Sequence, residues 1–280
     1  MNLFLGVDGG GTGCRVVLAN GQGHVLARAE GGAANIASSP ETALANILTA
    51  TRAAAAQAFG DGAEAALPRI RAGLGLAGAN AAGAAGWLGT HLPFAQSRIE
   101  TDAITAVKGA LGRADGIVAA MGTGSVFAIQ QAGQIRQIGG WGFWLGDEGS
   151  GAVLGRALLS RALRALDGAL PMTPLLRAIL DEFATPDRLV TFSLTARPGD
   201  YAAFAPRLWS SDDPAAHAIL TDALTQVRDT IAALQPTPAL PVTFIGGLGP
   251  AYAAHLTDWP QSPAKGTALD GALQLAMEDA

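Results

Sequence analysis

The chain is 280 residues long, carries a formal net charge of −5, and is 49% hydrophobic and 15% charged by residue count. This length exceeds that of a typical single domain and suffices for two lobes that each bury a core. Because the charge balance is acidic, we expect no basic surface, which argues against a nucleic-acid partner or an anionic membrane. The expected partner is a small molecule.

Signals for export or membrane insertion are weak. The chain enters an apolar strand without the basic region and cleavage site of a signal peptide, and the one cysteine, Cys14, excludes an intrachain disulfide framework. Residues 72–97 lack Asp, Glu, Lys and Arg, but six glycines there leave too little apolar area for a membrane span. We therefore expect a cytoplasmic protein.

The stretch from Leu3 to Ala19, LFLGVDGGGTGCRVVLA, predicts two strands joined by a glycine-rich tip. We expect the glycines at 9, 10, 11 and 13 to take positive φ and turn successive N–H groups toward a phosphate. Asp8 is placed to hold a hydrated Mg2+. A plain hairpin turn would need only two special residues, and neither a Walker loop nor a dinucleotide fingerprint matches the residues that follow.

Strands and helices are predicted to alternate over the next ninety residues. Asn35 lies on the loop before the first long helix. The expected elements are a strand over 24–29, a helix over 40–59, a strand over 70–76, a helix over 81–88, a strand over 98–101 and a helix over 103–111.

Asp102 lies at the carboxyl end of one of these strands, where a helix begins. Ligands of α/β sheets gather at such edges, so Asp102 is a candidate for a chemical role. Asp is also a good helix N-cap, and the local sequence leaves both interpretations open.

Residues 117–130, IVAAMGTGSVFAIQ, repeat the opening design of strand, glycine tip and strand. In both copies a further turn, a strand and a Gly-Gly pair follow the tip. Two copies of one unit imply duplicated lobes that face each other across a cleft, with phosphates between the two tips.

Residues 139–151, GGWGFWLGDEGSG, combine two tryptophans, a phenylalanine and two carboxylates with six glycines. Core packing accounts poorly for this composition, because glycine buries little area and buried carboxylates need partners. We expect a loop that lines a pocket. Ser150 should then cap a helix that runs to Leu166, with Leu154, Leu158 and Leu166 on one buried stripe.

In the rest of the sequence we expect helices and strands, and few residues with a chemical role. Residues 171–210 should form short helices, and Pro214 should open a helix that runs to Gln235. A strand over 242–245 delivers a third glycine tip, Gly246-Gly247-Leu248-Gly249, and a last helix is expected over 266–277.

Three glycine tips at strand ends resemble the phosphate 1, phosphate 2 and adenosine motifs of the actin, heat-shock chaperone and sugar kinase superfamily of ATPases. Within it, VDGGGT at 7–12, TDA at 101–103, MGTGS at 121–125 and GGWG with GDEGS at 139–150 look like the N-acetylglucosamine and glucosamine kinase branch, in the BadF/BadG/BcrA/BcrD ATPase family. The resemblance implies an α/β fold of two duplicated actin-like (ribonuclease H-like) lobes with a nucleotide cleft between them. We place the lobes at 1–112 and 113–265, with the C-terminal helix of 266–280 packed on the first.

The resemblance also implies roles for matching residues. Asp8 would hold Mg2+, and Asp102 would be the general base and also contact the sugar. The ATP phosphates would be held by Gly9, Gly10, Gly11, Thr12, Gly122, Thr123 and Gly124, and adenosine would face Gly246 and Gly247. The sugar would be held by Asn35, Trp141 and Asp147.

The implied reaction is phosphorylation of the 6-hydroxyl of N-acetylglucosamine or glucosamine by ATP with Mg2+. An N-acetyl group needs apolar walls, which Trp141, Phe143 or Trp144 could supply, whereas an ammonium group needs a carboxylate such as Asp147. The alternative is an ATPase that acts as a conformational switch or activator of a partner protein. Families that bind structural zinc or an iron-sulfur cluster do so through several cysteines. We set them aside because this chain has one cysteine. The oligomeric state is left open, with a homodimer as one option.

Overall fold

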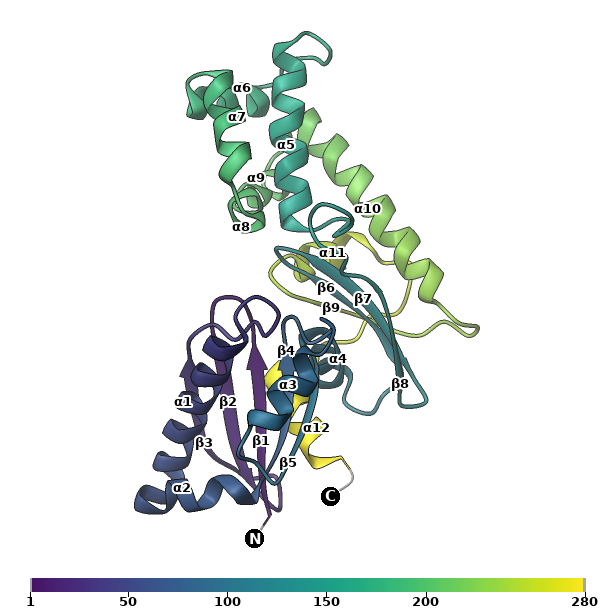
Figure 1. Cartoon of the computed structure of the whole chain (residues 1–280). Coiled ribbons are helices and arrows are strands. Elements are labelled where there is room, and N and C mark those ends of the chain that lie inside the picture. The colour runs from purple at the N-terminus through teal and green to yellow at the C-terminus, as the bar shows by residue number, and fades with distance from the viewer. Residues whose placement is uncertain (1, 279–280) are drawn as a thin grey trace. The chain divides into compact units, whose positions relative to one another are not determined.

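The computed structural model describes residues 2–278 of the chain (Figure 1). They fold into two compact units. Unit 1 comprises the residues up to Ala114 together with those from Ala264 onward, and unit 2 comprises Asp115–Pro263.

Unit 1 is built on a five-stranded sheet with the order β3-β2-β1-β4-β5. Strands β1, β2 and β3 form an antiparallel meander, whereas β4 and β5 run parallel to β1. The strands are β1 (Leu3–Gly9), β2 (Cys14–Asn20), β3 (Val25–Gly31), β4 (Ile70–Leu76) and β5 (Gln96–Thr101). The meander places the glycine tip at the same sheet edge as the ends of the parallel strands.

Helices cover both faces of this sheet. Helix α1 (Pro40–Phe59) packs on β2 and β3, while α12 (Ala268–Met277) packs on β1, β4 and α4 (Asp102–Leu111) (Figure 1). The close approach of α12 explains two glycines, since a Cβ at Gly6 or Gly73 would lie within 2.6 Å of its backbone. The remaining helical segments are η1 (Gly60–Gly62), α2 (Ala63–Ala66), η2 (Leu67–Arg69) and α3 (Ala84–His91).

Unit 2 repeats this topology in a four-stranded sheet with the order β8-β7-β6-β9. Again the first three strands are antiparallel, and the fourth runs parallel to the first. The strands are β6 (Gly116–Met121), β7 (Ser125–Gln131), β8 (Gln134–Gly139) and β9 (Val242–Ile245). The duplication predicted from the two glycine tips is therefore present in the strand order.

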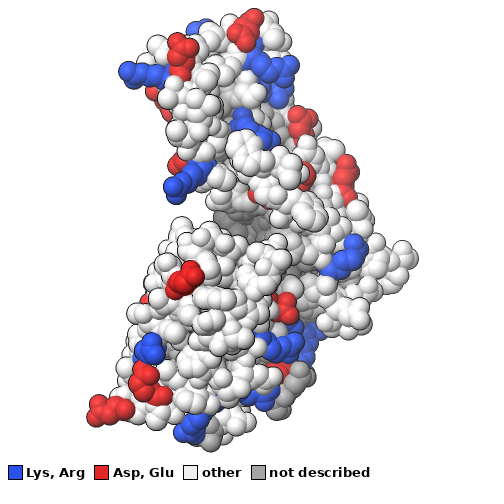
Figure 2. Space-filling view, viewed as in Figure 1, with Lys and Arg blue, Asp and Glu red and all other residues white. Residues whose placement is uncertain are grey.

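A helical layer fills the insertion between β8 and β9. Helix α5 (Gly151–Leu166) is capped by Ser150, whose hydroxyl accepts the Val153 N–H, as predicted. The other helices are α6 (Pro174–Phe183), α7 (Pro186–Thr195), α8 (Pro198–Ala202), α9 (Ala205–Trp209), α10 (Pro214–Leu234) and, after β9, α11 (Gly249–His255). On the face in Figure 2, acidic and basic side chains are scattered among uncharged ones.

Two predictions about helices are wrong in detail. The helix expected over 81–88 begins at Ala84, because Gly83 before it has a φ of +79° and ends a run of turns. Leu166 is 45% exposed rather than buried with Leu154 and Leu158. It lies eight residues beyond Leu158, which rotates it about 80° away from that stripe.

The uncharged segment 72–97 forms β4, α3 and the start of β5. Among the described residues, no helix combines the length and apolar character that a membrane crossing would need.

Candidate active site

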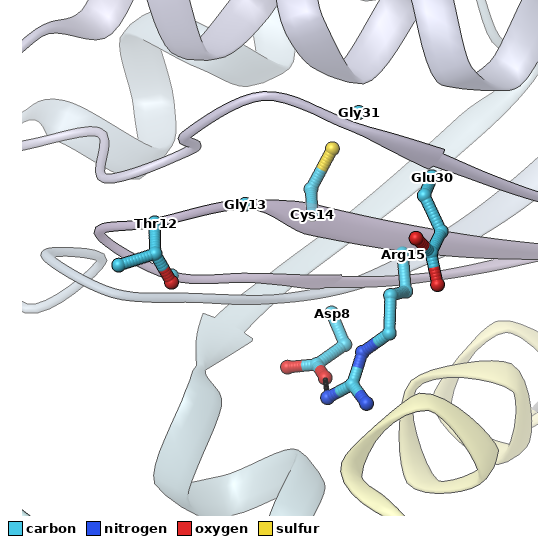
Figure 3. Close-up of a pocket in the computed structure, with 8 residues that line it drawn as sticks. Asp8, Thr12, Gly13, Cys14, Arg15, Glu30 and Gly31 are labelled. Atoms are coloured by element: carbon cyan, nitrogen blue, oxygen red, sulfur yellow. Dashed lines mark hydrogen bonds and ion pairs between the residues drawn. The ribbon is translucent and has the colours of Figure 1, made fainter.

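The first glycine tip joins β1 to β2 and borders a cavity of about 410 Å³ (Figure 3). The Gly10 N–H donates to the Gly13 carbonyl at 2.9 Å, and the Gly10 carbonyl accepts from Ala34 N–H at 2.8 Å. These bonds fix the tip against the loop that leads to Asn35. The cavity is lined by Asp8, Gly10, Thr12, Gly13, Cys14, Arg15, Glu30 and Gly31.

The glycines of this tip do not have the backbone conformation that we predicted. None of Gly9, Gly10, Gly11 and Gly13 has φ in the left-handed region. Position 9 requires glycine because a side chain would not fit. A Cβ there would lie 2.7 Å from the Leu76 side chain and 2.8 Å from that of Ala34. Gly10 and Gly11 face open space within 4 Å, so an approaching group can reach their backbone directly.

Asp8 is the second-last residue of β1, its side chain is only 13% exposed, and its carboxylate binds the Arg15 guanidinium at 2.5 Å. The two residues are direct cross-strand partners, which brings their side chains together (Figure 3). Sequence reasoning overlooked Arg15. The available signal was a basic residue in an otherwise apolar strand, across the hairpin from a carboxylate.

A metal ion held here would rely on few protein ligands. Among residues 2–278, no group of three or more His, Cys, Asp or Glu side chains could hold a metal ion. Mg2+ usually keeps several waters and binds through one or two carboxylates together with phosphates. The mostly buried carboxylate of Asp8, in a cavity that Glu30 also lines, fits that pattern.

Asp102 is the first residue of α4 but not its cap. The N-cap is Thr101, whose hydroxyl accepts the Ile104 N–H at 3.3 Å. Asp102 is an exposed residue, yet partial desolvation by nearby protein raises its pKa. A hydrogen bond from Ala103 N–H opposes this effect, and the negative charge of Asp8 adds to it. The capping role that the local sequence left open for Asp102 thus belongs to its neighbour.

Asn35 is half-buried, and its side-chain oxygen accepts the N–H groups of Ala37 and Ser38 at 3.0 and 3.1 Å. This local turn holds the side chain in one orientation. Gly78 packs against it, since a Cβ there would lie 2.8 Å from the Asn35 oxygen.

The second glycine tip joins β6 to β7 and touches the start of α5. The Gly122 N–H donates to the Gly124 carbonyl at 2.9 Å, and the carbonyls of Gly122 and Thr123 accept from Gly151 and Ala152 N–H at 2.8 and 3.1 Å. A Cβ at Gly122 would meet only the Gly124 carbonyl, at 4.0 Å. This tip, like the first, leaves its backbone accessible.

Asp147 lies directly against the second tip. Its side chain is buried, with 8% exposure, and a Cβ at Gly124 would come within 2.9 Å of its carboxylate. Burial raises the pKa of Asp147, and hydrogen bonds from the N–H groups of Ser125 and Gly142 partly offset this effect. Asp147 also has a φ of +60°, an unusual value for a residue with a side chain.

The aromatic residues of the 139–151 loop separate into two sets. Trp141 and Trp144 are 76% and 72% exposed, whereas Phe143 is 5% exposed and packs in the helical core with Tyr201. Phe143 therefore cannot form the pocket wall suggested for it. The loop is anchored further by Tyr252, whose hydroxyl donates to the Gly149 carbonyl at 2.6 Å.

The third glycine tip follows β9. Gly246 has a φ of +86°, and a Cβ there would lie 2.4 Å from the Met121 carbonyl oxygen, so the backbone itself requires glycine. The same carbonyl accepts the Leu248 N–H at 2.9 Å, which joins the third tip to the second. Gly247 faces open space.

Each unit thus gathers its own share of the predicted residues. In unit 1, the first tip, Asp8, the Asn35 loop and Asp102 lie at one sheet edge. In unit 2, the second tip, Asp147 and Gly246 converge around the end of β6.

Comparison with known proteins finds one curated relative that covers nearly the whole chain and another that covers about half of it. Glucosamine kinase GspK of Vibrio cholerae is 34% identical, covering 99% of this chain and 96% of the relative. An N-acetyl-D-glucosamine kinase of Dictyostelium discoideum is 28% identical, over 53% of this chain and 52% of its own length.

Solved structures agree in fold. A Chromobacterium violaceum protein, provisionally assigned as an N-acetylglucosamine kinase, superposes with a TM-score of 0.85 at 35% identity and 99% coverage of both chains. A glucokinase of the ROK family from Streptomyces griseus, at 16% identity and a TM-score of 0.55, shares the fold over 98% of both chains. The two-sheet architecture with repeated topology is thus that of the actin-like sugar kinases, as predicted.

The profile of the BadF/BadG/BcrA/BcrD ATPase family matches residues 5–265, a range that holds all three glycine tips, Asp8, Asp102 and the 139–151 loop. The chain therefore belongs to the BadF/BadG/BcrA/BcrD ATPase family.

Proposed function

We propose that this chain is an ATP-dependent kinase that transfers the γ-phosphoryl group to the 6-hydroxyl of an amino sugar, glucosamine or N-acetylglucosamine. The full-length similarity to a glucosamine kinase supports the substrate class. The observation that carries the chemistry is Asp102, a carboxylate with a raised pKa beside Asp8 that is not needed to cap its helix.

In this proposal the first and second glycine tips hold the ATP phosphates. The N–H groups of Gly10 and Gly122 are bonded within their tips, so the phosphate oxygens would be bound by the N–H groups of the other tip residues, and no side-chain cation is required at the tip itself. Gly9 to Thr12 and Gly122 to Gly124 would form these contacts, with adenosine beside Gly246 and Gly247. Asp8 would hold Mg2+, which neutralises charge on the phosphates when bound.

Phosphoryl transfer needs positioning more than covalent chemistry, because its transition state is loose. Asp102 would accept the proton of the sugar 6-hydroxyl as that oxygen attacks. Asn35 is restrained by its own turn, so its side-chain amide N–H groups could donate to a sugar hydroxyl. Trp141 offers an exposed aromatic face, and Asp147 a carboxylate for polar groups of the sugar. Since ATP is the donor, we also propose a cytoplasmic location.

The test is sugar-dependent release of ADP from Mg-ATP, measured with glucosamine, N-acetylglucosamine, glucose and the 6-deoxy analogues of the two amino sugars. We expect turnover with an amino sugar, a 6-phosphate product by 31P NMR, and none with the 6-deoxy controls. The ratio of kcat/KM for the two amino sugars identifies the preferred one. ADP release that is indifferent to every sugar would instead favour an ATPase that works as a conformational switch.

A further inference from the structure

A second cavity lies in unit 2, on the helical layer away from the glycine tips. It encloses about 350 Å³ between α5, α7 and α8, which is within the range of small-molecule sites. Its lining includes Trp144, Arg156, Ser160, Leu163, Arg164 and Val190. Of its lining residues, only Trp144 was considered for the sugar site, as a possible wall for an N-acetyl group, and the proposed kinase reaction uses none of the others.

The cavity is apolar on its walls and positive at its rim. Its charged lining residues are Arg156 and Arg164, and no Asp or Glu is among the lining side chains, although the chain as a whole has a net charge of −5. Arg156, Ser160 and Arg164 recur at four-residue spacing, so one face of α5 presents both guanidinium groups and a hydroxyl to the cavity.

One of these cations is held in place before any ligand arrives. The Arg156 guanidinium carbon lies 4.8 Å from the centre of the Phe143 ring, and its Nη1 donates to the Phe143 carbonyl at 3.5 Å. The Tyr201 ring packs 5.0 Å from that of Phe143, and its hydroxyl donates to the Ser193 carbonyl. A preorganised cation loses little conformational freedom on binding an anion.

The apolar wall is exposed to an unusual degree. Trp144 and Val190 are 72% and 47% exposed, and nearby Leu194 is 79% exposed. In Figure 2, both blue and red side chains lie among white ones over the region of unit 2 that holds α5 and α7, so the positive character belongs to the cavity lining and not to the whole face. A bare inorganic anion would gain nothing from these walls, and a neutral apolar molecule would gain nothing from the two arginines.

We propose that this cavity binds a small amphipathic anion, one with an aromatic or short aliphatic body and a carboxylate, sulfonate or phosphate group. The body would lie against Trp144, Leu163 and Val190, and the anionic group would meet Arg156 and Arg164. The proposal does not depend on the kinase reaction.

The probe that matches this chemistry is 8-anilinonaphthalene-1-sulfonate, and its uncharged counterpart is N-phenyl-1-naphthylamine. Fluorescence titration of the native, full-length protein should show saturable binding of the sulfonate at one site, with the uncharged probe binding at least about fivefold more weakly. Equal affinity for both probes would mean adventitious apolar binding only, and would overturn the proposal.

Four variants locate the binding. Arg164→Gln should weaken the sulfonate probe about fivefold and leave the uncharged probe unchanged. Arg161→Gln, on the same helix but outside the lining, should alter neither. Ser160→Asp should weaken the sulfonate more than Ser160→Asn, since the two differ only in charge. If Arg164→Gln and Ser160→Asp both bind the sulfonate like the parent protein, the probe lies elsewhere and the proposal is wrong.

Two further measurements exclude other occupants. Saturating Mg-ATP with amino sugar should not displace the sulfonate, and displacement would place the probe in the kinase site. Sedimentation velocity should show the same oligomeric state for the parent protein and Val190→Asp. A dissociation caused by that change would mean that a second copy covers the cavity, contrary to the proposal.

Discussion

Asp102 illustrates how one hydrogen bond changes the interpretation of a residue. A carboxylate at a helix start usually acts as a cap, but Thr101 supplies the cap of α4. The protein therefore keeps at this position a carboxylate whose charged form is disfavoured by desolvation and by Asp8. Carboxylates with a perturbed pKa are common in active sites.

Asp102→Asn should lower kcat by about 10²- to 10⁴-fold, the usual contribution of a general base. It should leave thermal stability at pH 7 nearly unchanged, because Asp102 is an exposed residue that does not cap its helix. Thr101→Ala is the matched control, and it should destabilise the protein by about 1 kcal/mol through loss of the cap. Near-normal turnover in Asp102→Asn would refute the catalytic assignment.

The pH dependence follows from the same group. The folded-state pKa of Asp102 lies above its unfolded value, so the folded protein binds more protons between the two, and its stability declines as pH rises through that window. Activity should instead rise as the pH rises through this window, since a general base works only when it is deprotonated. We expect the acid limb of kcat/KM to have an apparent pKa above that of an ordinary Asp. An acid limb at the usual value would argue against Asp102.

Cys14 is a buried free thiol with 3% exposure, and burial raises its pKa. Both effects reduce the reactive thiolate, so labelling by a disulfide reagent at pH 8 should be slow in the native protein and fast in urea. Labelling at the same rate in both conditions would mean that β2 is not packed as described.

At the scale of elements, the glycine tips combine two kinds of glycine. Gly11 and Gly122 face open space, so their lack of a side chain matters only to whatever approaches the backbone. Gly246 has left-handed φ and abuts the Met121 carbonyl, so its lack of a side chain matters to the fold. The two kinds predict opposite experimental outcomes.

Gly11→Val and Gly122→Val should each weaken ATP binding at least tenfold, as measured by calorimetry, with little loss of thermal stability, because a side chain fits the fold but blocks phosphate. Gly62→Val, at another glycine with ample space and negative φ, should leave both properties unchanged. Normal nucleotide affinity in both tip variants would remove the phosphate assignment. Gly246→Ala should instead destabilise unit 2 by more than about 1 kcal/mol, from left-handed strain of about 1–2 kcal/mol and a backbone clash.

At the scale of the whole molecule, the last helix of the chain packs on the sheet of unit 1, which the first residues of the chain begin. Helix α12 packs against β1, β4 and α4, and Leu275 within it is fully buried. Leu275→Ala should therefore lower the free energy of unfolding by about 2–5 kcal/mol, whereas Gln274→Ala should change it little. Denaturant titration of both variants checks this. Equal stability would show that α12 contributes little to the core of unit 1.

The sequence by itself determined the repeated strand, tip and strand pattern, most helix starts and ends, and the family. These features are local: alternation marks strands, Ser150 and Pro214 mark helix starts, and clustered glycines between two apolar strands are typical of a tip that approaches phosphate. Even the duplication was visible, because each copy carries its own turns and Gly-Gly pair.

Only the tertiary structure decided what the individual residues contact. The pairing of Arg15 with Asp8 depends on hairpin register, and the choice of Thr101 over Asp102 as cap depends on where the strand stops. Phe143 is buried whereas Trp141 and Trp144 are exposed, although all three lie in one short loop. The backbone conformations of the glycines in the first tip also differed from expectation. A position can require glycine because its φ is positive, because a Cβ would clash, or because a ligand must reach the backbone, and neighbours distant in sequence decide which of these applies.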